Sequence, residues 1–122
     1  MGCSDGQLGL GDNVNRLVPT RVAVEAFGGS RVLMAACGYV HTLAVTEDGE
    51  VYSCGEGEYA KLGHNDENDR QVFTRIAAQH FGLAKIVSAS AGVSHSLVVT
   101  EDGALYTWGM GQGLGHGVEE DK

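Results

Sequence analysis

The sequence predicts an all-β fold made of repeats, and two observations lead to this prediction. The segment GYVHTLAVTEDGEVYSCG at residues 38–55 returns as GVSHSLVVTEDGALYTWG at residues 92–109, with ten identical positions out of eighteen. The 122-residue chain also contains 19 glycines but one proline and one tryptophan, a composition that favours short strands and tight turns over helices. Self-similarity at roughly 20–50 residues is typical of solenoids, propellers and arrays, and this period lies just above that window.

The repeat extends on both sides of this segment. Residues 8–28 match residues 62–82 at the same offset, with ten identities in 21 positions. The sequence LGHG at 114–117 begins a third copy two residues early, because the glycine loop after Trp108 is shorter than its counterpart after Cys54. We therefore divide the chain into a partial first repeat, a second repeat and the start of a third, at residues 1–54, 55–108 and 109–122.

Each repeat is predicted to contain four antiparallel strands. The first strand is an apolar run, and the second is a segment in which apolar and polar residues alternate. An Asp-Gly pair then precedes the third strand, and it favours a tight hairpin because glycine accepts positive φ. A fourth strand is expected after a polar loop rich in Asn and Asp. The expected strands are Arg31–Ala36, His41–Thr46, Val51–Ser53 and Thr20–Val24, with copies at Lys85–Ser90, His95–Val99, Leu105–Thr107 and Thr74–Ala78. Four such strands make the blade of a β-propeller.

These units also carry a family resemblance. The strings DGQLGLGD and VPTRV, then CGYVHTLAVTEDGEVYSCG and AGVSHSLVVTEDGALYTWG, resemble the repeats of the regulator of chromosome condensation family. The resemblance implies blades of a seven-bladed propeller, which would need about three times the length of this chain, so that the chain alone forms an incomplete ring. Phe73 replaces the proline that stands at Pro19, and Cys54 replaces the tryptophan that stands at Trp108. The repeat signature consists of Gly38, His41, Asp48, Gly49, Gly55, Gly92, His95, Asp102, Gly103, Trp108 and Gly109.

Composition and charge narrow the classes of function. Eight basic and 16 acidic residues give a net charge of −8, which disfavours direct binding of nucleic acid. No apolar run approaches the ~18 residues of a membrane span, so we expect no membrane partner. Three cysteines and no export signal fit a reducing, intracellular compartment, cytoplasmic or nuclear.

The motifs that could indicate a metal, cofactor or catalytic site are better explained by a role in holding the fold together. His41 and His95 recur with the repeat, so we interpret them as buried imidazoles bonded to backbone near the preceding glycine. The spacing of Cys37 and His41 suits zinc, but no second pair completes four ligands. The string GEGEYA at 55–60 matches a dinucleotide motif but lacks the helix that must follow. We expect no catalytic residue, no metal and no cofactor, and hence no enzyme.

The resemblance implies several activities, of which protein binding fits this sequence best. Ultraviolet sensing in the family uses clustered tryptophans, and this chain has one. Nucleotide exchange on a small GTPase uses an inserted wedge, and the sequence contains no long insertion. We therefore predict a non-catalytic protein-interaction module. The alternatives are an exchange factor for a small GTPase, or a fragment of one, and a substrate-recognition propeller of a HECT-type ubiquitin ligase.

The loops are predicted to meet the partner, because propeller strands form the scaffold while the connections vary. The acidic balance predicts a basic protein surface or a small GTPase as partner. The chain is also expected to be part of a longer propeller or to assemble with further copies of itself, since repeats need covered ends. The candidate partner-binding residues are Asp12, Asn13 and Arg16 in one loop, Asp66, Glu67 and Arg70 in its copy, and Tyr39 in a strand connection.

Overall fold

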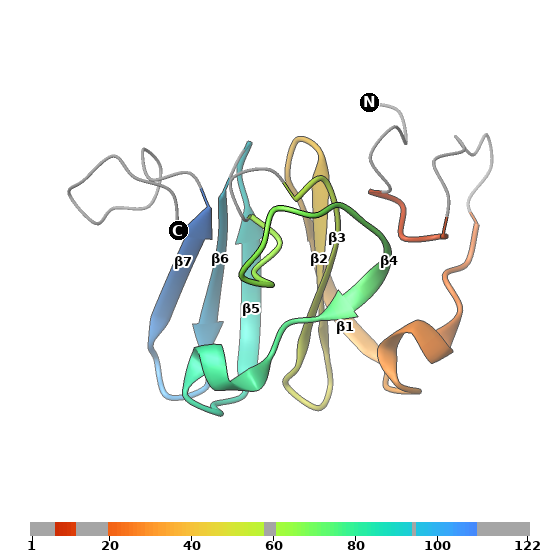
Figure 1. The fold of residues 1–122 in the computed structure, drawn as a ribbon. Coiled ribbons are helices and arrows are strands. Elements are labelled where there is room, and N and C mark those ends of the chain that lie inside the picture. Colours follow the sequence, from red (N-terminus) through yellow and green to blue (C-terminus); the bar gives the residue numbers. More distant parts are fainter. Residues whose placement is uncertain (1–6, 12–19, 58–60, 94, 110–122) are drawn as a thin grey trace.

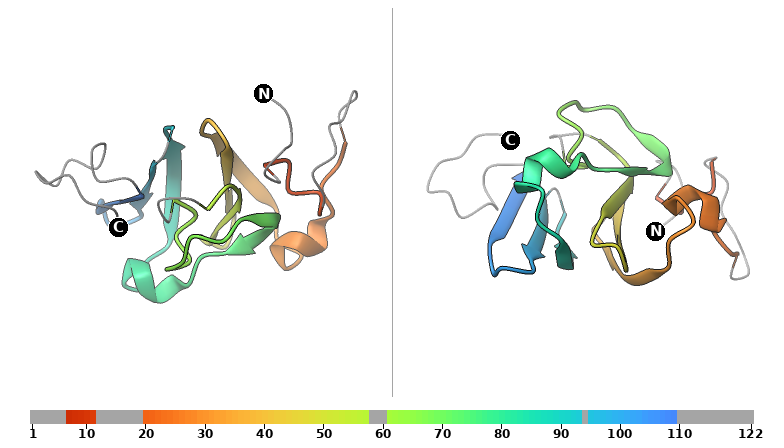
Figure 2. Two further views of the ribbon diagram at one scale, coloured as in Figure 1. Left: turned by 45° about the horizontal axis from the view of Figure 1, so that its top comes forward. Right: turned by 90° about the horizontal axis from the view of Figure 1, so that it is seen from below.

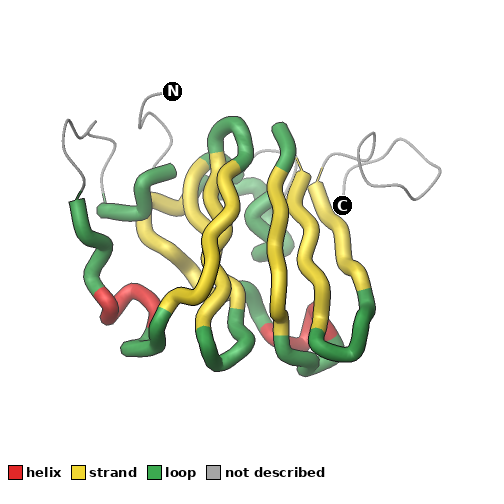
Figure 3. Tube along the Cα trace, turned by 180° about the vertical axis from the view of Figure 1, so that it is seen from behind, coloured by secondary structure: helices red, strands yellow, loops and turns green. Residues whose placement is uncertain are grey.

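The structure, a computed structural model, describes residues 7–11, 20–57, 61–93 and 95–109. Two antiparallel sheets stand side by side, with their strands running in nearly the same direction (Figures 1 and 3). The first sheet contains, in this order, β1 (Val32–Cys37), β2 (His41–Thr46), β3 (Val51–Gly55) and β4 (Arg70–Arg75). The second contains β5 (Ile86–Ala91), β6 (His95–Thr100) and β7 (Leu105–Gly109). In these ranges no helix has the length and apolar character to cross a membrane.

The repeated sequence gives repeated local structure. Gly49 and Gly103 have φ of 82° and 91°, which is the backbone that an Asp-Gly hairpin turn requires. A register shift occurs in β1 between Val32 and Met34, and the same shift recurs in β5 between Ile86 and Ser88. The all-β prediction and the antiparallel sheets are confirmed. The first sheet has the four strands of a blade, and the second has three within the described residues.

The fourth strand differs in position from the prediction. Residues 20–23 form no strand, and β4 begins four residues earlier than the expected Thr74–Ala78. Two 3-10 helices, η1 (Val24–Phe27) and η3 (Ala78–Phe81), occupy the remainder of these segments. Each helix ends at a glycine with φ near 64°, Gly28 or Gly82, because that conformation closes a helical turn. The first sheet thus takes its outer strand from residues assigned to the second sequence repeat.

The main core lies between the two sheets, whose arrangement is seen from two further directions in Figure 2. Leu43, Val45 and Val51 from the first sheet are 0%, 2% and 1% exposed. They pack with Ile86 and Val98 of the second sheet and with the η3 segment. A smaller cluster on the other face of the first sheet holds η1 through an edge-to-face contact between Phe27 and Tyr52, with ring centroids 5.3 Å apart.

Candidate partner-binding surface

His41 lies at the start of β2 and has no exposed surface. Its Nε2 is 3.0 Å from Ser96 Oγ in the neighbouring sheet. Ser96 Oγ donates its own hydrogen to Lys61 O at 2.7 Å, so His41 Nε2 must carry a hydrogen and donate it to the serine. The imidazole is buried as the sequence suggests, and this bond joins it to a side chain of the next sheet.

The surroundings of His41 keep the ring neutral at pH 7. Burial, reinforced by the nearby Lys61 ammonium, lowers the pKa of His41 to about 4. The ring also lies tightly against the preceding glycine, since a Cβ built on Gly38 would be 2.3 Å from His41 Cε1. His95 packs on Gly92 in the same way but is only half-buried. A neutral, enclosed imidazole suits a structural contact between sheets.

One backbone carbonyl in each repeat collects two side-chain hydrogen bonds. Lys61 O accepts from Ser96 Oγ and, at 2.8 Å, from Trp108 Nε1. Its counterpart in the first repeat, Gln7 O, accepts from Thr42 Oγ1 at 2.8 Å and Cys54 Sγ at 3.5 Å. Trp108 and Cys54 therefore both donate a hydrogen bond to the equivalent backbone carbonyl, which explains how the tryptophan position tolerates cysteine.

The loop between β3 and β4 contains a buried ion pair that the sequence did not single out. Lys61 is 1% exposed and forms a hydrogen-bonded ion pair with Glu56, whose side chain is 28% exposed. A buried ammonium needs a charged partner, because desolvation otherwise disfavours it strongly. Lysine is rarely fully buried, and no local sequence signal distinguishes Lys61 from an exposed lysine. The pair anchors the inner side of the loop.

The predicted acidic loop is held in one shape by its own side chains. Asp66 Oδ1 accepts from the Asn68 N–H at 3.0 Å, and Asp66 Oδ2 pairs with Arg70 Nη2 at 3.0 Å. These bonds, the backbone N–H first and the guanidinium second, lower the pKa of Asp66. Asp69 Oδ1 accepts from the Gly57 N–H at 2.9 Å, which ties the two ends of the loop together. Glu67 remains exposed.

The other predicted partner-binding residues lie apart from this loop or outside the described residues. Tyr39 is 65% exposed in the turn between β1 and β2, and its copy Val93 is 64% exposed in the turn between β5 and β6. Both turns lie at the upper end of the sheets in Figure 1, opposite the Asp-Gly hairpins. Asp12, Asn13 and Arg16 lie outside the described residues.

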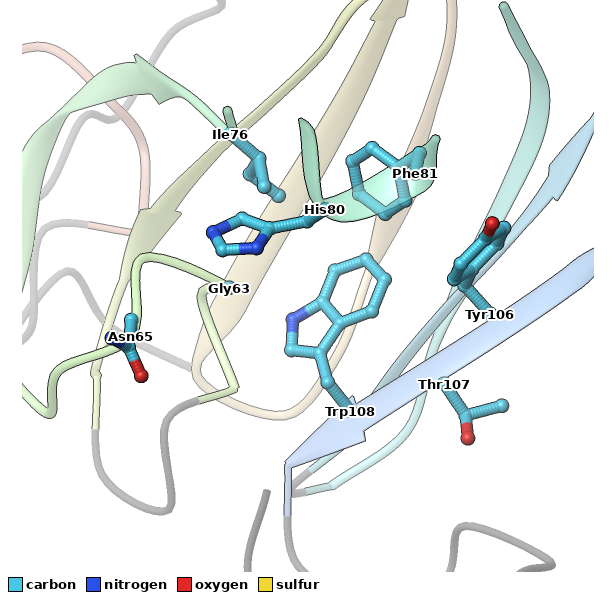
Figure 4. A pocket seen from close by; sticks show the side chains of 8 residues that line it. All are labelled: Gly63, Asn65, Ile76, His80, Phe81, Tyr106, Thr107 and Trp108. Carbon is cyan, nitrogen blue, oxygen red and sulfur yellow. The ribbon is translucent and has the colours of Figure 1, made fainter. Parts of the chain in front are cut away.

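A small aromatic cavity adjoins the acidic loop (Figure 4). Its volume is about 190 Å³, and Phe81 packs edge-to-face on Tyr106 at 5.4 Å and tilted on Trp108 at 5.7 Å between ring centroids. Asn65 and His80 supply the polar side chains of its wall. Within the described ranges, no three His, Cys, Asp or Glu side chains gather closely enough to hold a metal ion. The cavity lining residues are Gly63, Asn65, Ile76, His80, Phe81, Tyr106, Thr107 and Trp108.

Comparison with known families decides the identity of these repeats. A model of the regulator of chromosome condensation (RCC1) repeat matches residues 2–45 and 48–99. The chain belongs to the RCC1 repeat family. A second RCC1 repeat model matches residues 35–60 and 86–113, so the resemblance read from the sequence is confirmed.

Individual RCC1 relatives are much longer than this chain. The ultraviolet-B receptor UVR8 of Arabidopsis thaliana is 46% identical over 120 residues, which cover 96% of this chain and 26% of the receptor. The E3 ubiquitin-protein ligase HERC2 of Homo sapiens is 37% identical over 116 residues, covering 90% of this chain and 2% of the ligase. The structure of Prp20p from Saccharomyces cerevisiae, studied with its binding to Gsp1p and histones, superposes with a TM-score of 0.75 at 23% identity, over 98% of this chain and 31% of Prp20p. These matches establish RCC1-type propeller blades.

Proposed function

We propose that the chain is a non-catalytic protein-interaction module built of RCC1 propeller blades, acting within a larger propeller or an oligomeric ring. The repeated polar residues support a scaffold role, because their groups are engaged inside the fold. His41 and Ser96 bond across the sheet junction, and Trp108 donates to the Lys61 carbonyl. The side chains left to meet a partner are in the connections.

The observation that carries this proposal is the fixed, acidic loop between β3 and β4. Asp66 and Asp69 hold the backbone of the loop in shape, while Glu67 is exposed. A loop that is already ordered loses little conformational freedom when it binds. With a net charge of −8, the surface favours a basic region of a protein partner and disfavours nucleic acid. We place this partner inside the cell, in the cytoplasm or the nucleus.

Two more specific functions have support from individual relatives. Prp20p binds Gsp1p and histones, which makes nucleotide exchange on a small GTPase the first alternative. HERC2 is a ubiquitin ligase, which makes substrate recognition for such an enzyme the second. Light sensing like that of UVR8 is not proposed, because the one tryptophan, Trp108, is bound to the Lys61 carbonyl within a structural contact.

Binding of a lysine-rich peptide, followed by calorimetry at several salt concentrations, tests the proposal. Glu67→Lys should weaken binding several-fold and reduce its salt dependence, because it reverses a charge on the loop. Glu25→Lys makes the same change on η1, at another exposed acidic residue, and serves as the matched control. Equal weakening by both variants would show that net charge alone attracts the peptide. Accelerated nucleotide release from a small GTPase would favour the exchange-factor alternative.

A further inference from the structure

The end of the sheets at which β1 and β5 begin, the lower end in Figure 1, carries three large apolar side chains that are exposed. Leu33 and Val87 are the second residues of these strands and are 61% and 51% exposed. Leu83 lies between η3 and β5 and is 73% exposed. Among the described residues, no large apolar side chain is more exposed than Leu83.

Leu33 and Val87 are exposed at a bulge that occurs in both repeats. The pairing of β1 with β2 skips Leu33, and the pairing of β5 with β6 skips Val87. An extra residue of this kind leaves the ladder and re-aims its side chain. Both repeats therefore use the bulge to expose an apolar side chain at the same end of the sheet.

Leu83 has a backbone conformation that leucine disfavours. Its φ is 64°, in the left-handed region, where Cβ comes too close to the following carbonyl oxygen. The only other described residue besides glycine with positive φ is Asn65, and asparagine tolerates this region. The copy of Leu83 in the first repeat is Gly29, with φ of 84°. The position thus accepts glycine, and an exposed leucine there strains the backbone without a compensating contact inside the fold.

Neighbouring sheets leave these three positions open. Leu33 belongs to the first sheet and Val87 to the second, so each has the other sheet on one side, and both remain more than half exposed. Leu83 is exposed although the first sheet precedes it, and a Cβ built on Gly29 would have no atom within 4 Å although the second sheet follows it. Because the repeats are equivalent, a further sheet at either end would leave these positions open as well.

Both Asp-Gly hairpins adjoin the segment that leads from Leu83 into β5. Ile86 N donates to Gly49 O of the first hairpin at 2.8 Å. Glu101 N of the second hairpin donates to Lys85 O, also at 2.8 Å. The backbone after Leu83 is therefore held between the two hairpins, which places the exposed leucine close to their acidic side chains.

The hairpins make this end of the sheets negatively charged. Two cations lie in the segments beside them, Lys85 and Arg31, and the Arg31 guanidinium is 3.7 Å from Glu47. Glu50 and Arg75 form a pair of their own at 2.9 Å. Four carboxylates against two cations leave an excess of negative charge, which attracts a basic partner. The exposed hairpin carboxylates are Glu47, Asp48, Glu101 and Asp102.

We propose that the lower rim, formed by Leu33, Leu83, Val87 and the four hairpin carboxylates, docks a basic, amphipathic segment of a partner protein. Apolar side chains of that segment cover the two leucines and the valine, and its lysines or arginines meet the carboxylates. The acidic loop joins the other ends of β3 and β4, so the lower rim is a separate surface. The proposal therefore does not rest on binding by that loop.

Replacing Leu83 by the glycine of the first repeat tests the apolar part of the surface. The probe is a fluorescein-labelled amphipathic peptide of leucine and lysine, and fluorescence anisotropy measures its binding. Leu83→Gly should weaken binding about tenfold, because it removes a leucine side chain from the contact. Its urea midpoint should equal or exceed that of wild type, because glycine accepts positive φ. Leu83→Asn should act in the same way, since asparagine also tolerates this backbone.

Tyr39→Ser is the matched control, because Tyr39 is 65% exposed at the opposite end of the sheets. This variant should bind the peptide like wild type, whereas Val87→Ser should bind it several-fold more weakly. Equal weakening by the Tyr39 and Val87 variants overturns the proposal, since the peptide would then adhere to any exposed apolar side chain. Undiminished binding by both Leu83 variants overturns it too, as does a lower urea midpoint in both, which would give Leu83 a role in the fold instead.

The charged part of the surface has its own test, which also separates it from the acidic loop. Glu101→Lys should weaken binding of the same peptide several-fold and reduce its salt dependence. Glu67→Lys makes the same change on the acidic loop and should leave this binding unchanged. Weakening by Glu67→Lys alone would place the peptide on the loop, which overturns the lower-rim proposal and leaves the proposed function standing. Binding of phosphatidylglycerol vesicles, lost in Leu83→Gly, would assign the lower rim to a membrane and also overturn the proposal.

Discussion

The two Asp-Gly hairpins share a sequence and a backbone but differ in their surroundings. TEDG stands at residues 46–49 and again at 100–103. In both turns the glycine N–H donates to the threonine carbonyl at 3.0 Å. A Cβ built on Gly49 in the first turn would lie 2.7 Å from Cβ of Lys85, the residue before β5, whereas a Cβ built on Gly103 in the second turn would have no atom within 4 Å. Local sequence therefore determines the turn, while the adjoining sheet determines how much a change in the turn destabilises the protein.

The largest change in unfolding free energy is expected at the ion pair of Lys61, a residue whose counterpart in the first repeat is Gln7. Glu56→Gln would leave the Lys61 ammonium, 1% exposed, without its carboxylate and should lower the free energy of unfolding by about 3–5 kcal/mol. Lys61→Gln restores the residue of the first repeat, which is itself 5% exposed, and should lose only about 1 kcal/mol. Urea unfolding at pH 7 measures both. A larger loss for Lys61→Gln would mean that the ammonium itself stabilises the loop.

The second prediction compares equivalent leucines on the two sheets. Leu43→Ala should destabilise the protein by about 2–5 kcal/mol, because it opens a cavity in the core between the sheets. Leu97→Ala should lose about 1 kcal/mol or less, since Leu97 is only half-buried and its surroundings can relax. The measurement is urea unfolding at a concentration where the chain is monomeric. Equal losses would show that Leu97 is packed as tightly as Leu43 within a single chain.

The third prediction uses the pH dependence of stability. The pKa of His41 is about 4 in the folded protein, below its usual 6.5. The unfolded chain therefore binds more protons between these values, so the contribution of His41 is complete above pH 6.5 and is lost as the pH falls towards 4. The expected loss is roughly 2–3 kcal/mol. His64, whose pKa burial also lowers, adds to the same trend.

Two variants assign that trend to His41. His41→Gln should flatten the pH dependence of the unfolding free energy between pH 4 and 6.5, whereas His64→Gln should remove only the part of the trend that the lowered pKa of His64 adds. The pKa values of Asp66 and Asp102 are lowered from the usual 3.8, so these carboxyl groups change the unfolding free energy below pH 3.8, outside this window. An unchanged slope in His41→Gln would contradict the assignment.

Much of the fold was predictable because the same pattern occurs in two copies in the sequence. The alternation in β2 and β6 and the Asp-Gly turns predicted three strands of each sheet to within a few residues. The fourth strand was misplaced because it was expected only after the polar loop rich in Asn and Asp, at Thr74–Ala78. Phe81 and the left-handed Gly82 close a helical turn there instead, and the strand moves to the polar-flanked Arg70–Arg75.

Less of the candidate site was predictable, since it depends on contacts between segments distant in sequence. The acidic loop was identified from composition, but its shape depends on bonds such as that from the Gly57 N–H to Asp69. The cavity beside it was not predictable, because it is formed jointly by η3, β7 and the loop that contains Gly63. The burial of Lys61 likewise follows from the position of the second sheet, which no local pattern reports.

The smallest predicted effect returns to the two hairpins. Gly49→Ala and Gly103→Ala should each destabilise the protein by roughly 1–2 kcal/mol, because both glycines have positive φ and an alanine there is strained. Gly49→Ala should destabilise the protein by about 1 kcal/mol more than Gly103→Ala, since its Cβ would lie 2.7 Å from Lys85 Cβ and Cγ. The difference stays small because the lysine side chain is flexible and can move away. Thermal and urea unfolding of monomeric protein measure the difference. If Gly103→Ala were the more damaging change, the second hairpin would have to be packed against another segment, and the contrast between the two turns would fail.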